Sequence, residues 1–337
     1  MDPLTMLIAG VIFLVLLLML FFPESGIIYR IKRMRKDRSR EMIEDALKHL
    51  YDCEYKSIDC SLSSISGSLS IGGDKTAIVV ADLEAMNLIE SNENKIFLTA
   101  AGRSYALRII RIHRLWERHL ADNTSVLENE WHSLAETKEH ETSHEEADRL
   151  AARLGNPLLD PHGDPIPTVD GEIPKREGIT LNNLDNGIFA AIIHIEDEPK
   201  EVYAQLSAMG LYPGMQIHII ENSKNKIRFE ADGEECLLAP VLASNITAVP
   251  LAEKDTVTQK FESLSALKQD EAAIVVGISK AMRGQQRRRL LDFGVVPGTI
   301  VKVLLRSLSG DPTGYEIRGA TIALRKKQAD LIYIKRI

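Results

Sequence analysis

The chain has 337 residues, a formal net charge of −7, and a composition that is 45% hydrophobic and 26% charged. This length predicts two to four compact domains rather than one core, and this composition excludes a largely disordered protein. The three cysteines, Cys53, Cys60 and Cys236, follow neither a disulfide framework nor a zinc pattern, so we expect reduced thiols.

The N-terminal residues 4–22 contain no charged residue. A helix of nineteen residues rises about 28 Å, which is close to the ~30 Å hydrocarbon core of a bilayer. Seven Lys or Arg residues follow between Arg30 and Arg40, and the positive-inside rule places them in the cytoplasm, near anionic lipid. The sequence therefore predicts a single-pass protein of the cell membrane with the bulk of the chain cytoplasmic.

The next segment predicts a winged helix-turn-helix. Its hydrophobic pattern indicates helices, then two short strands around a polar turn, over residues 41–51, 61–69, 74–87, 88–90 and 96–98. DNA binding is a separate question, because the expected recognition helix carries a single cation, Lys75. If this helix reads DNA, we expect Lys75 and Thr76 to make the contacts.

Two further helices, expected over residues 105–120 and 128–141, carry potential metal ligands at helical spacing. Residues four apart share one helix face, and the sequence places there His113 with Glu117, then His132 with Glu136 and His140. Carboxylates and imidazoles without a thiolate suit Mn²⁺ or Fe²⁺ better than Cu⁺, and Zn²⁺ is also compatible. The alternative is an acidic, exposed helix with incidental histidines.

Residues 140–144 match the zinc-protease pattern H-E-x-x-H, which needs both histidines on one helix. Ser143 and Glu146 form a capping-box pattern that starts a new helix between those histidines, so we do not expect a protease. The sequence contains no phosphate-binding loop, nucleophile elbow or C-x-x-C motif. We therefore expect a protein that is not an enzyme.

Beyond a linker rich in Pro, Gly and Asp, residues 156–178, the chain repeats itself. Residues 181–251 and 263–334 each show short alternating strands and a helix that ends at a glycine before a Pro-Gly pair.

The pattern HxxxExxEH, which follows an RxHRLxExxL segment, resembles the metal-dependent repressors of the diphtheria toxin repressor and manganese transport regulator type. The resemblance covers roughly residues 41–167, including the segment PHGDPIP at 161–167, and the repeats resemble FeoA-like domains. It implies a winged helix-turn-helix (41–106), a helical metal-binding and dimerisation domain (107–155), a linker (156–178) and two SH3-like β-barrels (179–251 and 259–337). With the transmembrane helix (1–25) and the basic juxtamembrane segment (26–40) expected from the N-terminal sequence, the protein is expected to be of the α+β class.

The resemblance also implies ligands. It assigns the main metal site to Glu136, Glu139 and His140, with Asp45 from the first winged-domain helix, and further ligand positions to His113, Glu117 and His132. Lys48 falls where manganese-type members place a second carboxylate, which should weaken a two-metal site or limit binding to one ion.

Two functions are consistent with these features. The first is a membrane-anchored, Mn²⁺- or Fe²⁺-dependent transcriptional regulator that binds DNA as a homodimer. The alternative is a metal sensor or adaptor that does not bind DNA and regulates a ferrous iron or manganese transporter through its FeoA-like domains.

Overall fold

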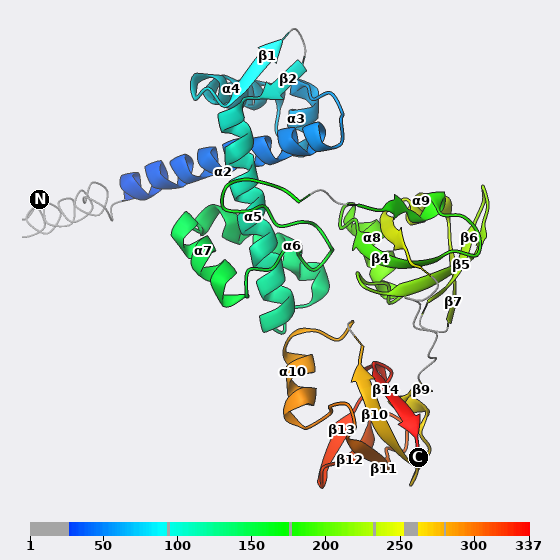
Figure 1. The fold of residues 1–337 in the computed structure, drawn as a ribbon. Coiled ribbons are helices and arrows are strands. Elements are labelled where there is room, and N and C mark those ends of the chain that lie inside the picture. Colours follow the sequence, from blue (N-terminus) through cyan, green and yellow to red (C-terminus); the bar gives the residue numbers. More distant parts are fainter. Residues whose placement is uncertain (1–26, 93–94, 175–176, 232–233, 253–261, 280) are drawn as a thin grey trace, which may run out of the picture. The chain divides into compact units, whose positions relative to one another are not determined.

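The structure is a computed structural model that describes residues 27–337 except 93–94, 175–176, 232–233, 253–261 and 280 (Figure 1). The chain divides into two compact units, an N-unit that ends at Arg111 and a C-unit that begins at Ile112.

The N-unit has the predicted winged helix-turn-helix order. It consists of α2 (Ile27–Tyr55), α3 (Leu62–Ser68), α4 (Gly73–Ala85), the antiparallel strands β1 (Ile89–Asn92) and β2 (Lys95–Leu98), and the start of α5 (Ala100–Asn123). Apolar side chains from all of these elements form one core, which includes Leu47, Leu50, Ile65, Leu83 and Leu98. Helix α2 begins well before the predicted residue 41, because no Gly or Pro interrupts residues 27–55.

The wing is tied to the start of α5 by Thr99. Its hydroxyl accepts a hydrogen bond from the backbone of Gly102 at 3.0 Å, and it donates to the carbonyl of Leu88 at 3.1 Å. A side chain at Gly102 would place its Cβ 1.9 Å from that carbonyl oxygen, so only glycine allows this approach.

The helical part of the C-unit contains the second half of α5, then α6 (Glu128–Glu141) and α7 (His144–Arg153). The bounds of α6 are those predicted from the sequence. The capping box of Ser143 and Glu146 is confirmed, and it starts α7 after α6 has ended. His140 and His144 therefore lie on different helices. The zinc-protease pattern requires both histidines on one helix, so this segment is not such a site.

The rest of the C-unit is two small sheet modules with one topology. The first β-module contains β3 (Ile179–Thr180), β4 (Phe189–Ile195), α8 (Lys200–Ala208), β5 (Gln216–Asn222), β6 (Ile227–Ala231), β7 (Glu234–Leu238), α9 (Pro240–Ala243) and β8 (Ile246–Pro250). The second contains β9 (Glu262–Ser263), β10 (Ala272–Ile278), α10 (Gly284–Asp292), β11 (Ile300–Arg306), β12 (Thr313–Ile317), β13 (Ala320–Leu324), α11 (Lys326–Ala329) and β14 (Ile332–Arg336).

The strand orders are β3-β8-β4-β5-β6-β7 and β9-β14-β10-β11-β12-β13, so the predicted repeat is confirmed. Each sheet packs around its own apolar core. The predicted SH3-like β-barrels need correction, however. In the described residues the two end strands of each sheet do not pair with each other, and one of them is only two residues long.

We also correct the predicted membrane localisation. No helix among the described residues is long and apolar enough to cross a membrane. The predicted span, residues 4–22, lies outside the described residues. The longest described helices, α2 and α5, carry charged residues along their length, which the bilayer core disfavours.

The expectation of three reduced thiols is wrong for two of them. Cys53 and Cys60 pair as a disulfide, whereas Cys236 is free and half-buried. The pairing joins the end of α2 to the residue before Ser61, which caps α3.

Candidate metal centre

Three predicted ligands converge between α5 and α6 in the C-unit. The imidazole Nε2 of His113 lies 3.2 Å from Oε1 of Glu117, one helical turn further along α5. Nδ1 of His132, on α6, lies 3.3 Å from the same oxygen. Glu117 is only 1% exposed, so this carboxylate is removed from solvent and surrounded by imidazoles. The ligand atoms of all three residues lie within 4.8 Å of one another.

Glu139 extends this group along α6. Its Oε2 lies 2.5 Å from Nδ1 of His113, and its Oε1 lies 3.6 Å from Nε2 of His140. Glu139 is 1% exposed, whereas Glu136 is exposed and directs Oε1 to within 3.3 Å of Nε2 of His132. The structure therefore places Glu136 beside His132 and Glu139 beside His113 and His140.

Asp45 and Lys48 lie on α2 in the N-unit, and both are half-buried. The proposed contribution of Asp45 to the metal site stays a prediction.

Two residues that the sequence did not single out join the same cluster. Nε2 of His162 lies 3.8 Å from Oε1 of Glu117, and Oδ2 of Asp197 lies 3.1 Å from Nδ1 of His132. Glu117, His162 and Asp197 also place ligand atoms within 4.8 Å of one another. We name the set of His113, Glu117, His132, Glu139, His162 and Asp197 the central cluster.

The loop that carries His162 is held by buried polar side chains. The Asp160 carboxylate, 4% exposed, accepts backbone hydrogen bonds from His162 at 2.9 Å and from Asp164 at 2.8 Å. Arg114 on α5 donates to the Pro165 carbonyl at 2.6 Å. Arg114 Nη2 also lies 3.5 Å from an Asp164 oxygen, so the loop is fixed to the helix that carries His113 and Glu117.

The same loop packs against β4 of the first β-module. The backbone of Ile195 donates to the His162 carbonyl at 3.0 Å. Gly163 has φ +95°, and a Cβ there would lie 1.9 Å from the carbonyl oxygen of Ile193. This close approach brings the end of β4, and Asp197 just beyond it, to the central cluster.

The charged groups of the central cluster shift one another's pKa values. Burial alone would raise the pKa of Glu117, but His113, His132 and His162 outweigh it and hold that pKa well below its usual range. Burial alone would lower the pKa of His132, but hydrogen bonds to Asp197, Glu117 and Glu136 raise it to about 12. In the absence of a cation, a proton on His132 therefore neutralises part of the negative charge.

The donor set fits a divalent metal. Carboxylate oxygens and imidazole nitrogens are ligands that Mn²⁺, Fe²⁺ and Zn²⁺ accept. Nδ1 of His162 is buried and has no hydrogen-bond partner among the described residues, which is costly for a polar atom. A bound ion would replace the proton on His132 and compensate the carboxylates together.

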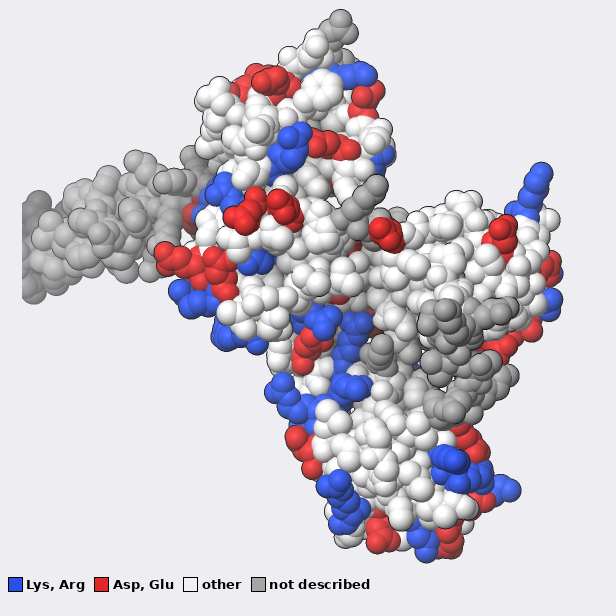
Figure 2. All heavy atoms as spheres, viewed as in Figure 1, with Lys and Arg blue, Asp and Glu red and all other residues white. Residues whose placement is uncertain are grey.

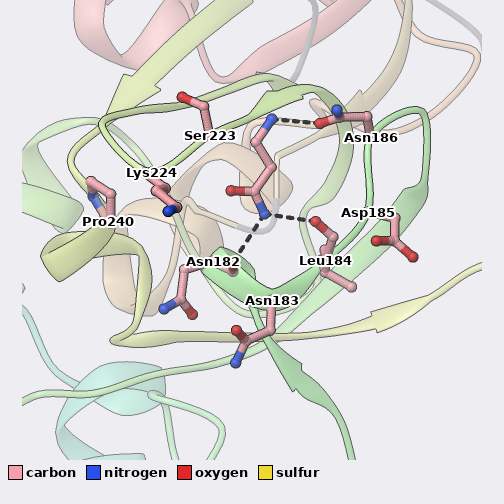
Figure 3. A pocket seen from close by; sticks show the side chains of 9 residues that line it. Asn182, Asn183, Leu184, Asp185, Asn186, Ser223, Lys224 and Pro240 are labelled. Carbon is pink, nitrogen blue, oxygen red and sulfur yellow. Dashed lines mark hydrogen bonds between the residues drawn. The ribbon is translucent and has the colours of Figure 1, made fainter.

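A polar pocket of about 480 Å³ at the edge of the first β-module is a different kind of feature (Figure 3). The Asn222 side chain donates to the carbonyls of Asn182 and Leu184, and its backbone N–H donates to Asn186. These bonds hold two loops together, and the pocket is widely open, so it is not a candidate metal site.

The predicted DNA-contacting residues differ in exposure. Lys75 is exposed on α4, whereas Thr76 is 1% exposed and its hydroxyl donates to the Gly72 carbonyl at 3.2 Å. On the face seen in Figure 2, acidic and basic side chains are interspersed over the N-unit rather than gathered into a basic patch.

Comparison with known proteins adds family relationships. Residues 99–168 match the metal binding and dimerisation domain of iron-dependent repressors, and residues 179–250 and 262–336 each match the FeoA domain. The iron-dependent repressor IdeR of Mycobacterium tuberculosis (strain ATCC 25618 / H37Rv) is 32% identical over 208 residues, which are 58% of this chain and 90% of the relative. The diphtheria toxin repressor of Corynebacterium efficiens is 27% identical over 198 residues, 56% of this chain and 86% of the relative.

Among solved structures, a manganese-dependent transcriptional repressor in complex with manganese matches with a TM-score of 0.58 and 26% identity. The match covers 62% of this chain and 99% of that chain.

Proposed function

The chain belongs to the iron-dependent repressor family, and from this premise we propose that it is a divalent-metal-dependent transcriptional regulator that binds DNA as a dimer. The observation that carries the proposal is the buried central cluster, in which three imidazoles surround the Glu117 carboxylate. Relatives named as repressors support a regulatory function rather than an enzymatic one.

We propose that the central cluster binds Mn²⁺ or Fe²⁺, with Zn²⁺ as a competitor, because its donors are all oxygen and nitrogen. Asp45, Glu136, Glu139 and His140 are retained as the ligands of the main site that the family resemblance implies. Glu139 belongs to both sets, since it lies beside His113 and beside His140. Two neighbouring ions would then share this carboxylate, and the Lys48 ammonium on α2 is expected to limit the occupancy of the second.

Metal binding would affect the conformation of the C-unit as well as the charge of the central cluster. The central cluster joins α5, α6, the loop with His162 and the segment after β4. An ion that binds all four segments stabilises their shared arrangement and disfavours arrangements in which they separate. Metal would therefore select one conformation of the C-unit, and in a dimer that conformation sets the separation of the two reading helices.

The DNA contact proposed for α4 involves little positive charge. Lys75 supplies the one basic side chain of α4, so most of the remaining affinity must come from backbone amides and polar groups. Fluorescence anisotropy of a labelled duplex, titrated with the full chain in Mn²⁺ or in a chelator, tests the proposal. Binding that needs the metal supports it, and binding that ignores the metal refutes it.

A further inference from the structure

A second group of potential metal ligands lies between α2 and α3 of the N-unit, and none of its members belongs to the central cluster. We propose that His49, Cys53 and Cys60 form a separate, sulfur-containing site for a zinc-type ion when the two cysteines are reduced. His49 and Cys53 are four residues apart on α2, and so share one face of that helix. Cys60 directly precedes the capping residue of α3.

The donor atoms lie close enough together to share one ion once the disulfide is reduced and the two Sγ atoms move apart. The Sγ atoms of both cysteines and a ring nitrogen of His49 lie within 4.8 Å of one another. Sγ of Cys53 lies 3.7 Å from Nε2 of His49, and the Ser64 hydroxyl lies 2.6 Å from that nitrogen and 3.5 Å from Sγ of Cys60. In a tetrahedral zinc site with Zn–S bonds of ~2.3 Å and Zn–N bonds of ~2.0 Å, neighbouring ligand atoms are about 3.5 Å apart.

The chemistry of the donors selects the ion. Cys53 is 6% exposed and Cys60 is 3% exposed. Zn²⁺ with two thiolates and a neutral imidazole carries no net charge, which suits a buried position. Thiolates favour borderline and soft ions, whereas the central cluster contains no sulfur and suits Mn²⁺ or Fe²⁺.

The disulfide is the competing, oxidised form of the same site. Its reduction by two molecules of a small thiol transfers two electrons and two protons, giving two protein thiols and one small-molecule disulfide. Binding of the ion then releases both thiol protons to solvent. In a reducing compartment the pair is a dithiol, and the ion replaces the covalent bond as the connection between α2 and α3.

Cobalt substitution in the full chain tests this site. We would reduce the protein with a phosphine, remove metals, and titrate Co²⁺ while recording absorption. A thiolate-ligated tetrahedral site gives a sulfur-to-cobalt charge-transfer band in the near ultraviolet, which oxygen and nitrogen ligands cannot produce. We expect this band, its loss when Zn²⁺ is added, and protection of two of the three thiols by Zn²⁺ against a thiol-modifying reagent.

Variants and controls separate the sites. The band should be weakened or absent in C60S, which leaves at most one thiolate ligand, and unchanged in both C236S, which removes the third thiol, and E117Q, which alters the central cluster. H49Q should retain thiolate absorption with Zn²⁺ affinity lowered about tenfold or more, because one neutral ligand is lost. Reduced wild-type protein without the band overturns the proposal whether or not C60S folds. A band that persists in C60S and disappears in C236S overturns it as well.

Discussion

Substitution of Glu117 by Gln should weaken metal binding at the central cluster more than any other single amide substitution on α5. Oε1 of Glu117 lies 3.2, 3.3 and 3.8 Å from nitrogens of three histidines, so an ion within reach of those rings must contact this carboxylate. The change keeps the shape and removes one negative charge from a buried site. We expect Mn²⁺ affinity to fall at least about tenfold, or about 1.4 kcal/mol, measured by calorimetry.

Glu141→Gln provides the matched control. Glu141 lies at the end of α6, exposed, and pairs with Lys138 at 2.7 Å outside the central cluster. The same chemical change there should leave Mn²⁺ affinity within experimental error of the wild type. Equal affinity of E117Q and wild-type protein, or an equal loss in E117Q and E141Q, would refute the reasoning.

Asp197→Asn should lower Mn²⁺ affinity about tenfold. It should also lower the pKa of His132 in the metal-free protein, measured by NMR titration. If neither the affinity nor this pKa changes, Asp197 is excluded from the site. The raised pKa keeps His132 protonated in the metal-free protein, so a bound metal ion must displace that proton. Mn²⁺ affinity should therefore rise about tenfold per pH unit between about pH 6 and 8. A Mn²⁺ affinity that calorimetry finds to be the same at each pH would contradict this. Gly163→Ala should lower the free energy of unfolding in urea by roughly 2 kcal/mol or more. Gly187→Ala, also at positive φ but with no atom near its Cβ, should lower it by only about 1 kcal/mol. Similar losses would show that the backbone shifts to avoid the clash with the Ile193 carbonyl oxygen. Lys75→Ala should reduce the slope of log affinity against log salt by about 0.9 per chain in a DNA titration, and an unchanged slope would remove α4 from the interface.

Local signals explain what the sequence predicted well. The bounds of α6 and the start of α7 follow from side chains within a few residues, above all the Ser143 cap. The repeated strand order of the two β-modules follows from short alternating segments and the same glycine turn in each copy. Such patterns do not depend on the rest of the fold.

The central cluster was only partly accessible from the sequence, because its assembly depends on distant packing. His113, Glu117 and His132 share helical spacing and could be recognised. His162 reaches the cluster only because Asp160 orders its loop, and Asp197 only because Gly163 lets that loop approach β4.

The other differences between the sequence prediction and the structure also have physical causes. Asp197 sits in a run of acidic residues after a strand, which in the sequence looks like any solvated surface.

Thr76 looked like a polar residue on a reading helix, but the turn of α4 directs it inward to the Gly72 carbonyl. Cys53 and Cys60 are seven residues apart at no recognised metal spacing, and only the turn between α2 and α3 brings their sulfurs together. The PHGDPIP segment was the one sequence signal that could have pointed to His162.

The most direct test of the account is DNA binding by the full chain at one Mn²⁺ concentration that saturates the wild type, measured by fluorescence anisotropy for wild type, E117Q and E141Q. We predict salt-sensitive binding by wild type and E141Q, loss of that binding in a chelator, and weakened binding by E117Q at the same Mn²⁺ concentration. Equal binding by all three proteins with and without Mn²⁺ would contradict the claim that the central cluster controls a DNA-binding regulator.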